Sequence, residues 1–69
     1  RNKEIAQARH VAVYILRTVT DMSLPNIGQI FNRDHTTVLS SVENVEKRMA
    51  QSPVFRAEVE ELIKEIKGN

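Results

Sequence analysis

Hydrophobic residues recur at intervals of three and four positions along most of the chain, and this is the spacing of residues on one face of an α-helix. Four such stretches follow one another, separated by short polar segments that contain good capping residues. No stretch alternates between apolar and polar residues in the manner of a strand. The pattern predicts an all-α fold, a compact bundle of about four helices.

The first predicted helix extends from about Lys3 to Thr18 and ends before the pair Thr20 and Asp21. Its expected inward stripe consists of Ile5, Ala8, Ala12, Ile15 or Leu16, and Val19. The apolar surface is widened by Val11, Val13 and Tyr14. We therefore expect this helix to be the central one.

The second predicted helix is short, and Leu24, Ile27 and Phe31 share its inward face. Ser23 is a good N-cap, and Pro25 falls in the first turn, where its missing N–H costs nothing. Gly28 should cost about 1 kcal/mol relative to alanine in a helix interior. We therefore expect the backbone of a neighbouring helix to approach it closely. Asn32 tolerates the left-handed conformation and can end this helix.

The third and fourth predicted helices have regular inward stripes. Asp34 is expected to cap the third helix, whose stripe is Val38, Val42, Val45 and Met49. The polar residues expected to face away from this stripe are Thr36, Thr37, Ser40 and Ser41. The fourth helix is expected to begin near Pro53 with Ser52 as its cap and to end at Gly68. Its stripe is Phe55, Val59, Leu62 and Ile66.

About three residues separate the second and third helices, which is too few for anything but a sharp turn. A short helix, a tight turn and a second helix are the elements of a helix-turn-helix, in which the N-terminal end of the second helix touches base edges in the major groove. The residues at that end are Arg33, Asp34, His35, Thr36 and Thr37. Carboxylate, imidazole and threonine side chains can all contact base edges. A simpler interpretation stays open, in which Asp34 is only an N-cap and the threonines are ordinary surface residues.

The net charge is +1, but positive charge is concentrated toward the N-terminus. Residues 1–20 contain four basic residues and one glutamate, whereas residues 41–69 contain five basic residues and six glutamates. The N-terminal charge could neutralise DNA phosphates, or it could form an ordinary solvated face. The chain has no cysteine and no apolar run near the roughly 18 residues of a membrane span, and no signal peptide is visible in it. These features favour a cytoplasmic protein.

Catalytic chemistry finds little support in the sequence. The two histidines, His10 and His35, have no nearby carboxylate or cysteine at the spacing of a metal site. The serines have no visible partner for nucleophilic catalysis, and no glycine-rich phosphate loop is present. Glutamates and lysines alternate along the last helix in the pattern of a solvated face. We therefore predict no enzyme, no metal and no cofactor in this domain.

Three segments, Ala8–Tyr14, Ser23–Gly28 and Phe31–Val38, resemble the C-terminal DNA-binding domain of the bacterial replication initiator DnaA. The string Arg-Asp-His-Thr-Thr-Val behind an Ile-Gly-x-x-Phe helix is highly specific to that family, and the resemblance covers nearly the whole chain in order. It implies a Trp-repressor-like helical bundle, with a helix-turn-helix preceded by a basic loop.

The resemblance also implies sequence-specific binding of double-stranded DNA at the DnaA box, a short, asymmetric, AT-rich sequence in the replication origin. By position, Asp34, His35 and Thr36 match residues that read bases in the major groove. Thr37 matches a residue near phosphate and thymine methyl groups, and Arg1 matches an arginine that enters the adjacent minor groove. The positions expected near phosphates are Lys3, Arg9, His10, Pro25, Arg33 and Ser40.

The chain departs from the family pattern at several of these positions. The family often has Arg-Pro-Arg-Gln where this chain has Gln7-Ala-Arg-His10, so His10 is the candidate replacement for a glutamine phosphate donor. Ser40 stands where a histidine is frequent, and only Arg1 and Lys3 represent the basic loop.

Longer relatives carry an upstream ATPase domain. We therefore expect residues 1–69 to be one helix-turn-helix domain of a longer protein, with ATP bound outside it. Relatives in this family are associated with acidic phospholipids and with proteins that regulate initiation, so the resemblance implies these as further partners.

Two other interpretations stay open. The first is a transcription regulator of another helix-turn-helix family, which would dimerise on palindromic half-sites. All four apolar stripes are expected to be used in the core, so a monomer is predicted instead. The second is an interaction module that docks a protein or an acidic membrane surface through its basic first helix. That module would be favoured if charge reversal at Lys3 and Arg9 changed binding and substitution of His35 or Thr36 did not.

Overall fold

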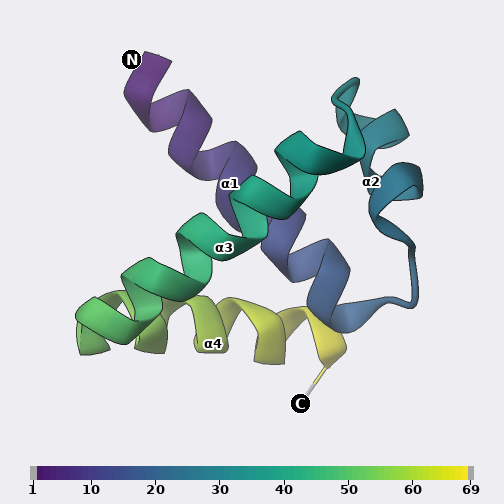
Figure 1. The fold of residues 1–69 in the computed structure, drawn as a ribbon. Coiled ribbons are helices and arrows are strands. Elements are labelled where there is room, and N and C mark those ends of the chain that lie inside the picture. The colour runs from purple at the N-terminus through teal and green to yellow at the C-terminus, as the bar shows by residue number, and fades with distance from the viewer. Residues whose placement is uncertain (1, 69) are drawn as a thin grey trace.

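The computed structural model describes residues 2–68, with side chains described for residues 4–68. In this range the chain forms α1 (Asn2–Val19), α2 (Leu24–Phe31), α3 (His35–Gln51) and α4 (Pro53–Lys67) (Figure 1). Figure 1 shows α3 crossing α1, with α2 beside the first turns of α3 and α4 returning from its last turn. α1 contacts all three other helices, but α3 does so more extensively, so the expectation that the first helix is the central one is wrong. The predicted all-α fold with a helix-turn-helix is confirmed.

Side-chain and backbone caps set the helix boundaries close to their predicted positions. The Ser23 hydroxyl accepts a hydrogen bond from the N–H of Asn26 at 3.2 Å, and the Ser52 hydroxyl accepts one from the N–H of Phe55 at 3.1 Å. Gly68 ends α4 in the left-handed conformation, with φ +79°. These bonds satisfy backbone groups that have no partner inside a helix.

The core lies where α1, α2 and α3 meet. Its buried members are Val13, Ile27, Val38 and Val42, and Val45 and Val59 are also buried. The predicted inward stripe of α3 is confirmed, with Met49 half-buried at its end. Because most of these residues are β-branched, the packed surfaces of the helices are stiff.

The predicted inward face of α1 is only partly correct, since Ala12, Ile15, Leu16 and Val19 are half-buried but the first residues of the stripe are exposed. Val13 is its buried residue, whereas Ile5 is 63% exposed and Ala8 is also exposed. Six consecutive apolar or aromatic residues run from Val11 to Leu16, so periodicity alone could not select the face. The choice is made by α2 and α3, which cover the side of α1 that carries Val13.

The predicted stripe of α4 is only partly buried. Val59 is buried and Phe55 half-buried, but Leu62 is 43% and Ile66 58% exposed. The expectation that the core uses all four stripes is therefore wrong, because α1 and α3 leave the last turns of the α4 stripe uncovered. The monomeric state was predicted from the use of all four stripes in the core. That reason no longer holds, and the monomeric state stays a prediction.

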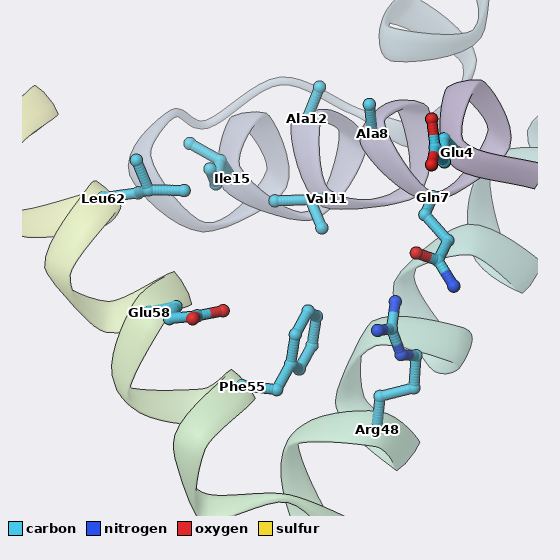
Figure 2. Close-up of a pocket in the computed structure, with 10 residues that line it drawn as sticks. All are labelled: Glu4, Gln7, Ala8, Val11, Ala12, Ile15, Arg48, Phe55, Glu58 and Leu62. Atoms are coloured by element: carbon cyan, nitrogen blue, oxygen red, sulfur yellow. The ribbon is translucent and has the colours of Figure 1, made fainter. Parts of the chain in front are cut away.

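An apolar groove remains open between α1 and α4 (Figure 2). The ring of Phe55 lies between the two helices, and the guanidinium of Arg48 lies 4.1 Å from the centre of that ring. This cation–π contact holds the last turns of α3 against the start of α4. Across residues 2–68, no helix is long and apolar enough to cross a membrane.

Candidate nucleic-acid interface

The turn between α2 and α3 consists of Asn32, Arg33 and Asp34. Asn32 adopts the left-handed conformation, with φ 58° and ψ 45°, as predicted for a residue that ends α2. Its N–H donates to the carbonyl oxygen of Gln29 at 3.3 Å. The N–H of Arg33 donates to the carbonyl oxygen of Gly28 at 2.8 Å. These bonds satisfy the last carbonyls of α2 and reverse the chain, so that α3 starts at once.

Gly28 provides the space that this turn needs. A Cβ atom at Gly28 would collide with the backbone carbonyl oxygen of Arg33 and lie 3.5 Å from Cγ2 of Val38. The sequence predicted the backbone of a neighbouring helix here, and the structure instead has the backbone of the turn. Gly28 is therefore required for close approach of the chain to itself.

Asp34 caps α3 through one carboxylate oxygen. Its Oδ1 accepts hydrogen bonds from the backbone N–H of Thr37 and from the hydroxyl of Thr36, both at 2.9 Å. The bond from Thr37 is the main cause that lowers the pKa of Asp34, and the Thr36 hydroxyl and the adjacent His35 act in the same direction. Both of these bonds end on Oδ1, so Oδ2 can accept from an external donor. The cap and a DNA contact are therefore compatible.

The first two turns of α3 present one continuous exposed face. His35 and Leu39 lie one turn apart on it, and Thr36 and Ser40 form the adjacent row. Thr37 is exposed as well. The face thus offers hydrogen-bonding groups together with apolar surface, the two kinds of group that read base edges and thymine methyl groups.

Leu39, which is 42% exposed, was missed as an interface residue. A leucine in a helix is first assigned to the core. Its spacing of four from His35, away from the row of Val38 and Val42, is the signal that could have identified it.

Arg33, in the turn, and Pro25, at the start of α2, are both exposed. Nη1 of Arg33 donates to the carbonyl of Asn32 at 3.3 Å. Pro25 occupies the first turn of α2, as predicted. Both residues are accessible to a polyanion that lies along α2 and the start of α3.

His10 connects α1 to α3. Its Nδ1 lies 2.7 Å from the hydroxyl oxygen of Ser41, which is only 2% exposed. The prediction that Ser41 faces away from the core is therefore wrong, because its hydroxyl has a partner on α1 that the sequence pattern could not reveal. Only Nε2 of His10 is left for a phosphate. The adjacent Arg9 is half-buried, and its Nε is buried with no hydrogen-bond partner.

Two predicted DNA-contacting residues are not placed by the structure. Arg1 lies outside the described residues. Lys3 lies in the first turn of α1, but its side chain is outside the described part. The contacts among the described residues therefore bring together the turn, the start of α3 and His10 of α1, and they do not place Pro25 beside them.

Folding stability should decrease as the pH falls below about 6.5. Burial lowers the pKa of His10 from its ordinary value of 6.5, and the nearby charges of Arg9 and Arg48 add to this effect. The unfolded chain then binds more protons than the folded one near this pH, so the free energy of unfolding falls with decreasing pH. Asp34 acts in the same direction at lower pH, because its pKa is lowered from 3.8.

Thermal unfolding followed by circular dichroism between pH 7.5 and pH 5 measures this dependence. The Tm of the wild-type protein should fall over this range, and that of His10→Gln should change less. Parallel curves for the two proteins would show that another group is responsible.

Comparison with known proteins gives one family match. The model of the family described as bacterial dnaA protein helix-turn-helix matches residues 1–45. This range contains α1, α2, the turn and the exposed face of α3. No solved structure matches the chain.

Proposed function

Because this chain belongs to the family of bacterial DnaA helix-turn-helix domains, which bind DNA in replication initiation, we propose that it recognises the DnaA box of a replication origin. α3 enters the major groove of the duplex with its N-terminal end, and the N-terminal basic segment with Arg1 lies in the adjacent minor groove. The observation that carries this proposal is the exposed run Asp34–Thr37 at the free end of α3, directly after a tight turn.

The base-reading roles follow from the chemistry of each side chain. Oδ2 of Asp34 accepts from an exocyclic amine such as cytosine N4, and the ring of His35 donates to a purine acceptor. Thr36 contributes a hydroxyl and a methyl group, and Thr37 packs its methyl group against thymine or contacts a phosphate. The exposed Leu39 adds apolar surface for a second thymine methyl.

The remaining residues of the proposed interface hold the duplex by its backbone. Arginine side chains and helix N-termini are the usual partners of phosphates, and they fix the register without reading sequence. The residues assigned to this role are Lys3, Arg9, His10, Pro25, Arg33 and Ser40.

The wider setting is part of the same proposal. Residues 1–69 act as one DNA-binding domain that binds the box as a monomer, at the nucleoid in the cytoplasm. An ATPase domain of the longer protein supplies nucleotide control, and acidic phospholipids and initiation-regulating proteins are further partners.

An NMR titration tests where the duplex binds. Addition of a duplex with one DnaA box to the ¹⁵N-labelled protein should shift the amide signals of Arg33–Ser40 and of the Arg9 region, and leave residues 58–67 of α4 nearly unchanged. Shifts confined to α4 would contradict the proposed interface.

Arg9→Ala should weaken binding to every duplex by a similar factor. If Arg9 contacts one phosphate, its loss should reduce the slope of log Kd against log salt concentration by about 0.9. Fluorescence anisotropy at several salt concentrations measures this slope.

Arg56→Ala is the matched control, because it removes the same charge from a different surface. Arg56 lies on α4, where its Nε donates to Glu60 at 3.0 Å. An equal change of slope in both variants would mean that net charge, and not a contact from Arg9, sets the salt dependence.

A further inference from the structure

One polar contact joins the two helices that cross at the centre of the fold. Among the side-chain hydrogen bonds of the described residues, the bond between His10 and Ser41 is the one that links two helices. It connects residues 31 positions apart in the sequence. The surrounding buried surface is formed by aliphatic side chains, including Val13, Val38 and Val42.

The hydrogen bond adds a directional constraint to the aliphatic packing between α1 and α3. Apolar contacts are non-directional, so they do not by themselves require one particular pair of atoms to meet. A hydrogen bond requires a narrow range of distance and angle. If α3 rotated, the hydroxyl of Ser41 would be left buried without its partner, which is costly. The bond therefore favours one rotational setting of α3 on α1.

This setting determines where the proposed reading residues point. Ser41 lies six residues after His35, which is less than two helical turns or about 9 Å along the axis. A rotation of α3 by about 20° would move an outer side-chain atom by about 2 Å, because such atoms lie about 6 Å from the helix axis. A displacement of this size breaks a hydrogen bond to a base edge.

We propose that His10 and Ser41 are positioning residues for DNA recognition, which hold α3 at the rotation that directs Asp34–Thr37 toward the base edges. This inference rests on the proposed function of α3. It goes further by assigning sequence discrimination to a buried pair that touches no base. The atom of His10 that performs this positioning is Nδ1, which faces Ser41.

Two substitutions of His10 separate the two ring nitrogens. His10→Asn keeps a polar atom close to the position of Nδ1, where it can still bond Ser41. His10→Gln places its amide near the position of Nε2, where it can still reach a phosphate but no longer matches Ser41. Ser41→Ala removes only the buried hydroxyl, and Thr18→Ala removes an exposed hydroxyl of α1 as the control.

The readout is the ratio of dissociation constants for a scrambled duplex and for a DnaA-box duplex, measured by fluorescence anisotropy. Circular dichroism identifies a temperature at which every variant is folded. Ser41→Ala and His10→Gln should each reduce this ratio by about tenfold, with the affinity for the scrambled duplex changed by less than about twofold. The double variant should lose no more than either single variant, because both remove the same bond.

His10→Asn should weaken binding to both duplexes, because it removes Nε2, but should retain the wild-type ratio, whereas Thr18→Ala should change neither affinity. A wild-type ratio in Ser41→Ala would overturn the positioning role, and so would an equal loss in His10→Asn and His10→Gln. If the wild-type protein itself does not distinguish the two duplexes, the proposed function fails, and the positioning role fails with it.

Discussion

Gly28→Ala should lower the free energy of unfolding by about 2 kcal/mol, although alanine is the better helix former by about 1 kcal/mol. The added Cβ would collide with the backbone carbonyl of Arg33, and no side-chain rotation can relieve a collision with backbone. The turn around Asn32 must therefore shift. For a domain of this size the expected decrease in Tm is about 10 °C, measured by circular dichroism.

Two alanine variants control for other causes of this loss. Gln29→Ala changes the exposed neighbour in the same helix and should leave the Tm nearly unchanged. Gly68→Ala introduces a side chain at φ +79° where no other atom lies within 4 Å, so it tests backbone conformation without a collision. Its effect should be smaller, because it lies at the end of α4. A Tm for Gly28→Ala at or above that of the wild type would contradict the role assigned to Gly28.

His35→Ala should reduce the preference for the DnaA box by about 1–3 kcal/mol, which is about 5- to 150-fold, and leave binding to a scrambled duplex nearly unchanged. His35 is exposed and is not part of the core, so the Tm should not change. Anisotropy titrations with both duplexes measure the two affinities. Equal losses for the two duplexes would remove His35 from the base-reading residues.

Thr36 should show the same loss, and two substitutions identify which of its groups is read. Thr36→Val keeps the methyl group and removes the hydroxyl that bonds Asp34, whereas Thr36→Ser keeps the hydroxyl and removes the methyl group. A loss in Thr36→Val alone would assign recognition to the hydroxyl and the Asp34 geometry that it supports. A loss in Thr36→Ser alone would assign recognition to a thymine methyl contact. An unchanged preference in both variants would contradict a base-reading role for Thr36.

The features that sequence analysis predicted are those that depend on neighbouring residues. Ser23, Asn32 and Asp34 cap or end helices through bonds to groups within five positions in the chain, so residue type and spacing suffice. The exposed run that starts at Asp34 follows from the same local pattern. This is why the helix-turn-helix and its candidate site could be located without a structure.

The features that sequence analysis missed depend on contacts between helices. The buried face of α1 is selected by α2 and α3, and its nearly uniform apolar run gave no indication of Val13 as the core residue. Ser41 is buried because His10 meets it across the helix crossing. Leu39 is exposed because it lies about 100° around the helix from Val38, to one side of the row of valines that forms the core of α3.

The central claim is that α3 reads a specific sequence, and one binding measurement tests it most directly. Fluorescence anisotropy compares a labelled duplex that carries a DnaA box with a scrambled duplex of equal composition, both near physiological salt. We predict a preference for the box of at least about tenfold, equivalent to about 1.4 kcal/mol. Equal affinity for the two duplexes would contradict base readout, and would mean that the protein meets DNA through a nonspecific basic surface.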